Sequence, residues 1–192
     1  MELVFATNNQ NKLSEIRSLI NSSIKILSLE DIGCSDELPE TNPTLKLNAY
    51  QKAKYVFDKF GYDCFSDDSG LEIHALNGEP GVYSARYAGE DCNAKNNINK
   101  VLLNLKNNKN RNANFRTVIS LLLKGESYFF EGTCQGFISE TSLGSNGFGY
   151  DPIFIPSGAS MTFAEMSKFE KGKLSHRSKA VKKLIEFLNN EK

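Results

Sequence analysis

The feature that most constrains the fold of this chain is a pair of long strand-like runs in its second half. They cover residues 113–124 and 128–139, and the short segment Gly125-Glu126-Ser127 joins them. Two such runs separated by three residues that include a glycine predict a β-hairpin. Because these are the two longest strand-like runs in the sequence, they could extend through both halves of a bent molecule and leave a cleft between two lobes.

The hydrophobic pattern of the remaining chain predicts helices dispersed among shorter strands. One helix is expected at 12–20, and another is expected to start at Asn42-Pro43 and to stop at Gly61. The other predicted elements are helices at 93–105 and 175–190, strands at 3–6, 24–29, 63–66 and 71–76, and a glycine-rich loop followed by a short strand at 144–156. This order predicts an α/β fold with a mixed sheet, in a single two-lobed domain that spans residues 1–192.

Composition and charge limit the class of protein. The chain has 192 residues, 40% of them are apolar, and 23 basic side chains balance 23 acidic ones. Proteins that wrap nucleic acid normally carry a basic excess, so no nucleic-acid partner is expected. An anionic partner must instead meet a local cluster of charge, which favours a small phosphorylated ligand.

The cysteines and the apolar runs indicate the compartment. Four cysteines lie far apart, and a chain with this much apolar content does not need disulfides, so we expect them to be reduced. The start of the chain lacks the pattern of a signal peptide, and no apolar run reaches 18 residues. These patterns predict a soluble, cytoplasmic protein without a membrane partner.

The first candidate site is Thr7-Asn8-Asn9-Gln10-Asn11-Lys12, where a predicted strand leads into a helix. Backbone N–H groups at a helix N-terminus attract phosphate, and a lysine in the first turn adds positive charge. A lysine there opposes the helix dipole, so helix stability alone would not favour it. An ordinary polar turn with a solvated lysine is the alternative interpretation.

The second candidate site is Asp67-Asp68-Ser69-Gly70, directly after a predicted strand. Adjacent carboxylates repel each other and need a cation or protons to offset the repulsion. Their hard oxygens suit Mg²⁺, which commonly binds one or two carboxylates together with substrate phosphates. On an extended segment the two side chains point to opposite faces, so only one is expected to reach the metal. A solvated polar turn is the alternative.

An arginine supplies a third candidate. Arg86 stands between Tyr83 and Tyr87, after the segment Glu79-Pro80-Gly81. Its guanidinium group can direct two donors at phosphate oxygens. A surface arginine packed on tyrosine rings is the alternative.

Two segments nearer the C-terminus carry residue types that suit a nucleotide base. In residues 145–152 glycines flank Phe148, so an aromatic face and the backbone can approach a flat ligand. Lys171 could meet phosphate, while His176 and Arg177 offer donors for keto oxygens. The alternatives are a glycine-rich loop whose rings lie in the core and an ordinary polar helix start.

The order of these segments resembles that of the inosine triphosphate pyrophosphatase family, whose members are house-cleaning purine nucleotide hydrolases. The resemblance extends from Phe5 to Ala180, and its most specific blocks are residues 66–89 and 147–155. It implies a two-lobed α/β homodimer that needs Mg²⁺ and has a nucleotide-binding cleft. It also implies hydrolysis of non-standard purine nucleoside triphosphates (ITP, dITP, XTP) to the monophosphate and pyrophosphate.

The resemblance also assigns roles to individual residues. Asp68 corresponds to the family's catalytic acidic residue, which also serves the metal, Glu40 lies where the family has a metal-associated glutamate, and Ser69 lies beside Asp68 in the substrate site. The other expected substrate contacts are Thr7, Asn8, Asn9, Gln10, Asn11, Lys12, Arg86, Phe148, Gly149, Tyr150, Asp151, Lys171, His176 and Arg177. The chain departs from the family where common glycines are replaced by Asn8, Asn11 and Asn146. Because asparagine tolerates left-handed backbone conformations, the first turn is expected to survive.

On this interpretation Asp68 orients or deprotonates the attacking water. His176 and Arg177 favour keto purines, because ATP would leave their donors unpaired. Two other functions stay open: a pyrophosphatase of modified pyrimidine triphosphates and a nucleotide-binding module without catalysis.

Overall fold

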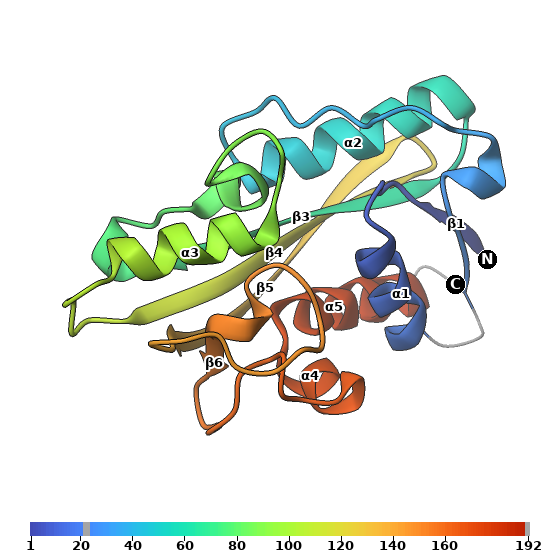
Figure 1. Ribbon diagram of the computed structural model, residues 1–192. Helices are drawn as coiled ribbons and strands as arrows, with labels where there is room; N and C mark the ends of the chain where they lie inside the picture. Colours follow the sequence, from blue (N-terminus) through green and yellow to red (C-terminus); the bar gives the residue numbers. More distant parts are fainter. Residues whose placement is uncertain (21–23, 191–192) are drawn as a thin grey trace. The chain divides into compact units, whose positions relative to one another are not determined.

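The computed structural model describes residues 1–20 and 24–190 and confirms the predicted mixed α/β class (Figure 1). The elements in chain order are β1 (Glu2–Phe5), α1 (Gln10–Leu19), β2 (Lys25–Leu27), η1 (Glu30–Ile32), α2 (Leu45–Phe60), β3 (Cys64–Ile73), η2 (His74–Leu76), η3 (Gly81–Arg86), α3 (Ala94–Asn104), β4 (Asn112–Leu123), β5 (Glu126–Ile138), η4 (Asp151–Ile153), β6 (Phe154–Pro156), α4 (Lys168–Leu174) and α5 (His176–Asn190), where η marks a 3₁₀ helix.

Six strands form one sheet in the order β2-β1-β3-β4-β5-β6. β1 pairs in parallel with β2 and β3, whereas β5 pairs antiparallel with β6, so the sheet is mixed. The three longest strands, β3, β4 and β5, lie side by side in the middle of this order. The predicted mixed sheet with long central strands is therefore confirmed.

The long hairpin is confirmed, but its turn was placed wrongly. β4 and β5 are joined by Lys124 and Gly125, which have φ values of 52° and 88°. A two-residue turn with positive φ at both positions matches the right-handed twist of the flanking strands. The strand resumes at Glu126, so the turn is shorter than the Gly125-Glu126-Ser127 segment expected from the sequence.

The segment around the two adjacent aspartates differs from the structure expected from the sequence. Two strands flanking an Asp67–Gly70 turn were expected, but β3 continues through it for ten residues, eight of them buried. The charges of the aspartates are offset by buried cations described below, so the polar residues do not need to turn out into solvent. Gly70 fits because a Cβ atom there would lie 2.5 Å from the carbonyl oxygen of Gly81.

Two helix boundaries also differ from expectation. α2 is capped by Thr44, whose side chain accepts a hydrogen bond from the Leu47 N–H, and not by Asn42. α4 precedes α5 as a separate helix, capped by reciprocal bonds between Ser167 and Glu170. Ser167-x-x-Glu170 is a capping-box sequence, so this helix could have been found from the sequence.

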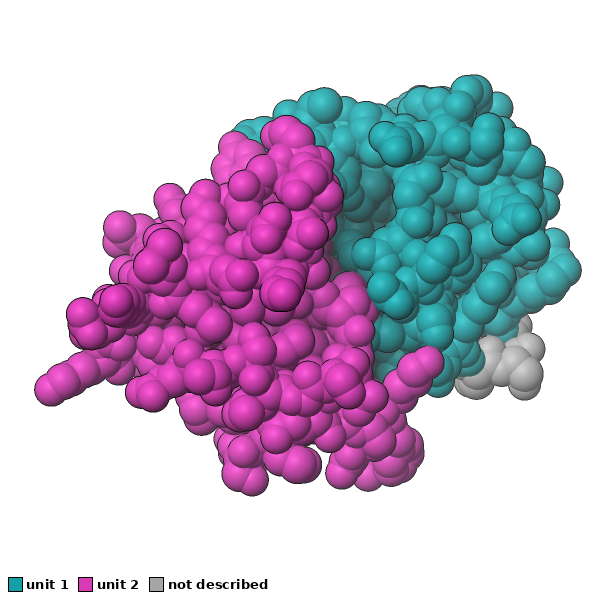
Figure 2. Space-filling model, viewed as in Figure 1, with its two compact units in different colours: residues 1–68, 117–132, 177–192 teal, residues 69–116, 133–176 magenta. Residues whose placement is uncertain are grey.

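The chain divides into two compact units (Figure 2). Unit 1 consists of Met1–Asp68, Thr117–Gly132 and Arg177–Lys192, and unit 2 consists of Ser69–Arg116 and Thr133–His176. β3, β4 and β5 each contribute residues to both units. The nucleotide-binding cleft and the single-domain organisation expected from the sequence stay predictions.

Unit 1 has an apolar cluster on each face of its part of the sheet. On β1, Leu3 and Phe5 pack into the cluster that includes apolar residues of α1 and α5, whereas Val4 and Ala6, the residue directly after the strand, pack into the cluster that includes α2. This division follows from the alternation of side chains along a strand. α1 and α5 therefore cover one face, and α2 covers the other.

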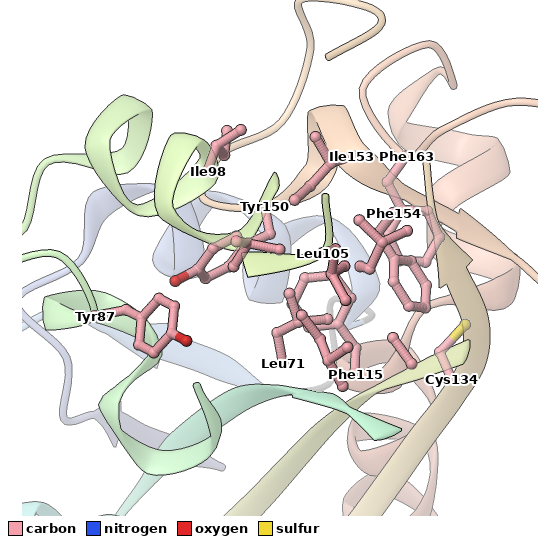
Figure 3. Packing of buried hydrophobic residues seen from close by; sticks show 14 of the residues in the cluster. Leu71, Tyr87, Ile98, Leu105, Phe115, Cys134, Tyr150, Ile153, Phe154 and Phe163 are labelled. Carbon is pink, nitrogen blue, oxygen red and sulfur yellow. The ribbon is translucent and has the colours of Figure 1, made fainter. Parts of the chain in front are cut away.

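Unit 2 has one aromatic-rich core, shown in Figure 3. The ring of Phe115 meets that of Phe154 edge to face at 4.7 Å and stacks near Phe163 at 6.2 Å. α3 contributes Ile98 and Val101 to the same core, and Leu105, directly after the helix, joins them. This packing fixes α3 and the start of β4, which frame the segments of unit 2 discussed below.

The cysteine expectation is confirmed, because Cys34, Cys64, Cys92 and Cys134 are all free thiols. Across residues 1–20 and 24–190, no helix combines the length and the apolar character needed to span a bilayer.

Candidate active site

Asp67 is the centre of a buried cluster of charges in unit 1. Its side chain has no exposed surface, and its Oδ1 and Oδ2 atoms lie 3.0 Å from Lys12 Nζ and 3.0 Å from Arg177 Nε. Burial alone would raise the pKa of Asp67, but Lys12, Arg177 and Lys52 outweigh it and hold this pKa well below its usual range. The lowered pKa favours the ionised form of Asp67, which pairs with two cations.

The cluster extends through Arg177 back to α1. Arg177 Nη1 donates to Glu15 Oε2 at 2.5 Å, and Glu15 lies one helical turn after Lys12. Lys12, Asp67, Arg177 and Glu15 thus form a chain of ion pairs that alternate in charge. Buried charges are tolerated only when they are paired and hydrogen-bonded, and these ion pairs satisfy that condition for Asp67 and Arg177.

Asp68 has a different environment from its neighbour. Asn48 Nδ2 donates to Asp68 Oδ2 at 3.2 Å, and only 6% of Asp68 is exposed. Burial raises the pKa of Asp68, the negative charge of Glu40 raises it further, and Lys52 and Lys12 oppose the shift without reversing it. Asp68 therefore binds a proton more readily than Asp67, which suits a group that accepts a proton from water.

α2 supplies the residues that contact the carboxylates of Asp68 and Glu40. Its buried face consists of apolar residues together with Asn48 and Lys52, which are one turn apart. Lys52 Nζ pairs with Glu40 Oε1 and donates to the Asp67 carbonyl oxygen at 2.8 Å. Although burial alone would raise the pKa of Glu40, Lys52 lowers it below its usual value. The sequence analysis missed both α2 residues, although a lysine on the apolar face of a helix is a signal that could have identified one.

The first loop is organised by its own asparagines. Asn9 caps α1 and accepts hydrogen bonds from the N–H groups of Asn11 and Lys12, and Thr7 Oγ1 accepts one from Asn9. Gln10 and Asn11 are exposed in the first turn of α1. Three N–H groups of the loop that was expected to bind phosphate therefore have a partner within the chain.

Asn8 connects this loop to the segment that leads to Glu40. Its Nδ2 donates to the Asp36 carbonyl oxygen at 2.9 Å, and its Oδ1 accepts from the Leu38 N–H at 3.0 Å. Asn8, Asn11 and Asn146 are not among the described non-glycine residues that have a positive φ. The backbone at these positions therefore does not require the glycines expected from the family resemblance.

The donor set fits a metal ion that binds together with phosphate. In the described part of the chain, no group of three or more His, Cys, Asp or Glu side chains gathers to hold a metal by itself. Asp68 and Glu40 are close enough for the charge of one to raise the pKa of the other. Mg²⁺ usually takes one or two carboxylates and completes its shell with water and phosphate oxygens, so two hard oxygen donors suit it.

The glycine-rich loop of unit 2 is closed around Asp151. Asp151 Oδ2 accepts from the Phe148 N–H at 2.8 Å and from Lys171 Nζ at 2.6 Å. Lys171 Nζ also lies 4.9 Å from the centroid of the Phe148 ring. Gly147 has a φ of 74°, and a Cβ atom there would lie 2.0 Å from Asp151 Oδ2. The loop therefore needs a glycine at this position, and Lys171 is bound to the loop that holds Phe148.

Three more of the expected residues also lie in unit 2. The His176 ring stacks on the Phe115 ring, with 4.6 Å between the ring centroids and an angle of 10° between the ring planes. Tyr150 OH donates to the Ser84 carbonyl oxygen at 2.8 Å, which ties the glycine-rich loop to η3. Arg86, at the end of η3, has its guanidinium carbon 5.3 Å from the Tyr83 ring.

The expected residues thus fall into two groups. Unit 1 brings together the first loop, Glu40, Asp67, Asp68 and Arg177, and unit 2 brings together Phe148–Asp151 and Lys171. Ser69 is half-buried in β3, and Gly149 has a φ of 60° in the loop. The structure places Arg177 on Asp67 and Glu15, two carboxylates that the sequence analysis did not connect with it.

Comparisons with known proteins agree along the whole chain. A dITP/XTP pyrophosphatase of Flavobacterium johnsoniae is 57% identical over the full length of both chains. The fold matches the Staphylococcus aureus Ham1 protein with a TM-score of 0.90 and 40% identity over all of both chains. It also matches a nucleoside-triphosphatase, a dITP/XTP pyrophosphatase of Mycobacterium abscessus, with a TM-score of 0.77 and 37% identity over 96% of this chain and 98% of the other. The sequence model of the Ham1 family covers residues 3–187, and the chain therefore belongs to the Ham1 family.

Proposed function

We propose that this protein hydrolyses the non-standard purine nucleoside triphosphates dITP, ITP and XTP to the nucleoside monophosphate and pyrophosphate. The observation that carries the proposal is the 57% identity over two full chains with a dITP/XTP pyrophosphatase. The buried carboxylates of unit 1 supply groups that such a hydrolysis needs.

Asp68 is the proposed catalytic residue. A water molecule attacks the α-phosphorus, the bond from this phosphorus to the bridging oxygen breaks, and pyrophosphate leaves with that oxygen. The proton of the water passes to Asp68, whose pKa is raised by burial and by Glu40. Asp68 and Glu40 would hold Mg²⁺, which when bound offsets the negative charge of the phosphate oxygens.

Lys12 is the proposed phosphate contact of unit 1. Its ammonium group is held 3.0 Å from Asp67 Oδ1 and 3.3 Å from the Asp67 carbonyl oxygen. Since both anchors belong to one fully buried residue, the position of the charge is fixed before substrate binds. A fixed donor strengthens binding of developing charge because it loses little freedom on binding.

The glycine-rich loop and His176 are proposed to bind the base. Phe148 can stack on a purine, and Asp151 and Lys171 hold the loop in shape. His176 is proposed to donate to the 6-keto oxygen. Arg177 is instead proposed to hold Asp67, because its Nε and Nη1 atoms already donate to carboxylates.

The test is a panel of triphosphates assayed for pyrophosphate release with Mg²⁺ and with EDTA. A site that hydrogen-bonds a keto oxygen can reject the amino analogue strongly, so kcat/KM for ITP and XTP should exceed that for ATP at least about a hundredfold. EDTA should abolish turnover. Release of orthophosphate in place of pyrophosphate, a preference for modified pyrimidines, or equal rates with ATP would contradict the proposal. The homodimer and the cytoplasmic location stay predictions.

A further inference from the structure

One face of α3 holds the backbone on both sides of Arg86. Asn97, Lys100 and Asn104 follow each other at spacings of three and four residues, so they lie on the same side of the helix. All three side chains make hydrogen bonds to residues 85–88. The sequence analysis assigned no role to any of them.

Asn97 hydrogen-bonds the backbone of residues 85–88 through both the oxygen and the nitrogen of its side-chain amide. Its Oδ1 accepts from the Ala88 N–H at 2.6 Å, and its Nδ2 donates to the Ala85 carbonyl oxygen at 2.7 Å. Only 4% of Asn97 is exposed. A buried asparagine inside a helix contributes little to helix stability, so its value lies in these two contacts, which fall on either side of Arg86.

The other two side chains fix the next residue, Tyr87. Lys100 Nζ donates to the Tyr87 carbonyl oxygen and lies 4.3 Å from the centroid of its ring. Asn104 Nδ2 donates to the Tyr87 hydroxyl at 2.9 Å, and this hydroxyl donates to Glu79 Oε2. η3 ends at Arg86, so the following backbone groups have left the helix and depend on such side-chain partners.

These contacts fix the Cα–Cβ direction of Arg86 without using its guanidinium group. We propose that Asn97 is a positioning residue for Arg86, which it holds in place to bind the phosphates of the substrate. The inference rests on the proposed function and on the expectation from the sequence that Arg86 donates to phosphate oxygens. A displacement of about 1 Å at a binding group can cost about a hundredfold in rate. A side chain that holds the backbone of Arg86 in place therefore contributes to the rate even if it adds little to helix stability.

A double-mutant cycle tests the inference, with kcat/KM for ITP as the measurement. Asn97→Ala and Arg86→Ala should each lower kcat/KM about tenfold or more, in line with the cost of displaced or missing phosphate contacts. The double variant should have the same kcat/KM as Arg86→Ala alone, because Asn97 has no guanidinium group to position once Arg86 is replaced by alanine. Asn96→Ala, which changes the same residue type at an exposed position of α3, should behave as wild type.

The outcomes separate the inference from the proposed function. If Asn97 only stabilises unit 2, its effect should appear unchanged in the Arg86→Ala background, and this result would overturn the inference. Full activity of Arg86→Ala would also overturn it, while pyrophosphate release by the wild type would leave the proposed function standing. Should Asn97→Ala not fold, Asn97→Asp takes its place in the cycle, since it keeps the acceptor for Ala88 and loses the donor to Ala85.

Discussion

The two adjacent aspartates of β3 should have different effects when each is replaced by asparagine. Loss of the Asp67 charge should lower the stability of the fold, and loss of the Asp68 charge should abolish turnover. Asp67→Asn would leave Lys12 and Arg177 without the anion that lies 3.0 Å from each of them. Removing one partner of a buried ion pair costs about 3–5 kcal/mol, because the remaining charge stays buried without compensation. Against a total stability of about 5–15 kcal/mol, this loss is severe.

Asp68→Asn should leave stability nearly unchanged and abolish turnover. Burial and Glu40 already disfavour the ionised form of Asp68, so a neutral side chain removes an unfavourable charge. Asn48 Nδ2 can donate to the new amide oxygen as it does to the carboxylate. We expect a change in unfolding free energy below about 1 kcal/mol, the net value of one hydrogen bond. The amide cannot accept a proton from water, so pyrophosphate release should be lost.

Urea unfolding followed by far-UV circular dichroism suits this comparison, because the chain has no tryptophan. Asp58→Asn is the matched control, since Asp58 pairs with Lys54 at an exposed site and such pairs contribute about 0–1 kcal/mol. Activity is measured on the same samples by pyrophosphate release from ITP. Equal losses of stability in Asp67→Asn and Asp68→Asn would refute the division of roles, and so would wild-type turnover in Asp68→Asn.

Other consequences of the structure can be measured in single variants. Arg177→Ala should lower kcat/KM for ITP and for ATP by the same factor, because Arg177 holds Asp67; a change in the ratio would show that Arg177 reads the base. Gly147→Ala should raise KM for ITP and leave unit 1 folded, since a Cβ atom would displace Asp151; an unchanged KM would count against the loop as the base site. Cys92 should be the one thiol of the native protein that reacts with a thiol reagent, because the other three are buried and burial raises the pKa of Cys64 to about 12; Cys92→Ser should therefore abolish labelling.

The sequence located the aspartates of β3 but not the strand that contains them. Adjacent carboxylates favour a turn when only their own polarity is considered, and the sequence analysis therefore broke the strand at Asp67. The structure keeps the strand intact because Lys12 and Arg177 reach Asp67 from α1 and α5. These partners are 55 and 110 residues away in the chain, so no local pattern could reveal them.

Three smaller errors concern features for which the sequence did carry a local signal. The turn of the hairpin was misplaced by about one residue, and α4 was missed although its capping box is local. Lys52 was overlooked because a single lysine on an apolar face is usually a side chain that extends to solvent. In the structure Lys52 is buried and pairs with Glu40. The charged residue that interrupted the apolar face of α2 was therefore a residue of the candidate site.

The charges of unit 1 explain why a metal ion belongs in the proposed reaction. Lys12, Lys52 and Arg177 carry three positive charges, whereas Glu15, Glu40, Asp67 and Asp68 carry four negative ones when all are ionised. Every cation of this set is already paired with a carboxylate, so the cluster has no surplus positive charge for a triphosphate. A divalent cation on Asp68 and Glu40 would reverse the sign of the cluster from one negative to one positive charge. The same lysine that the sequence suggested as a phosphate ligand can therefore act as one only after that reversal.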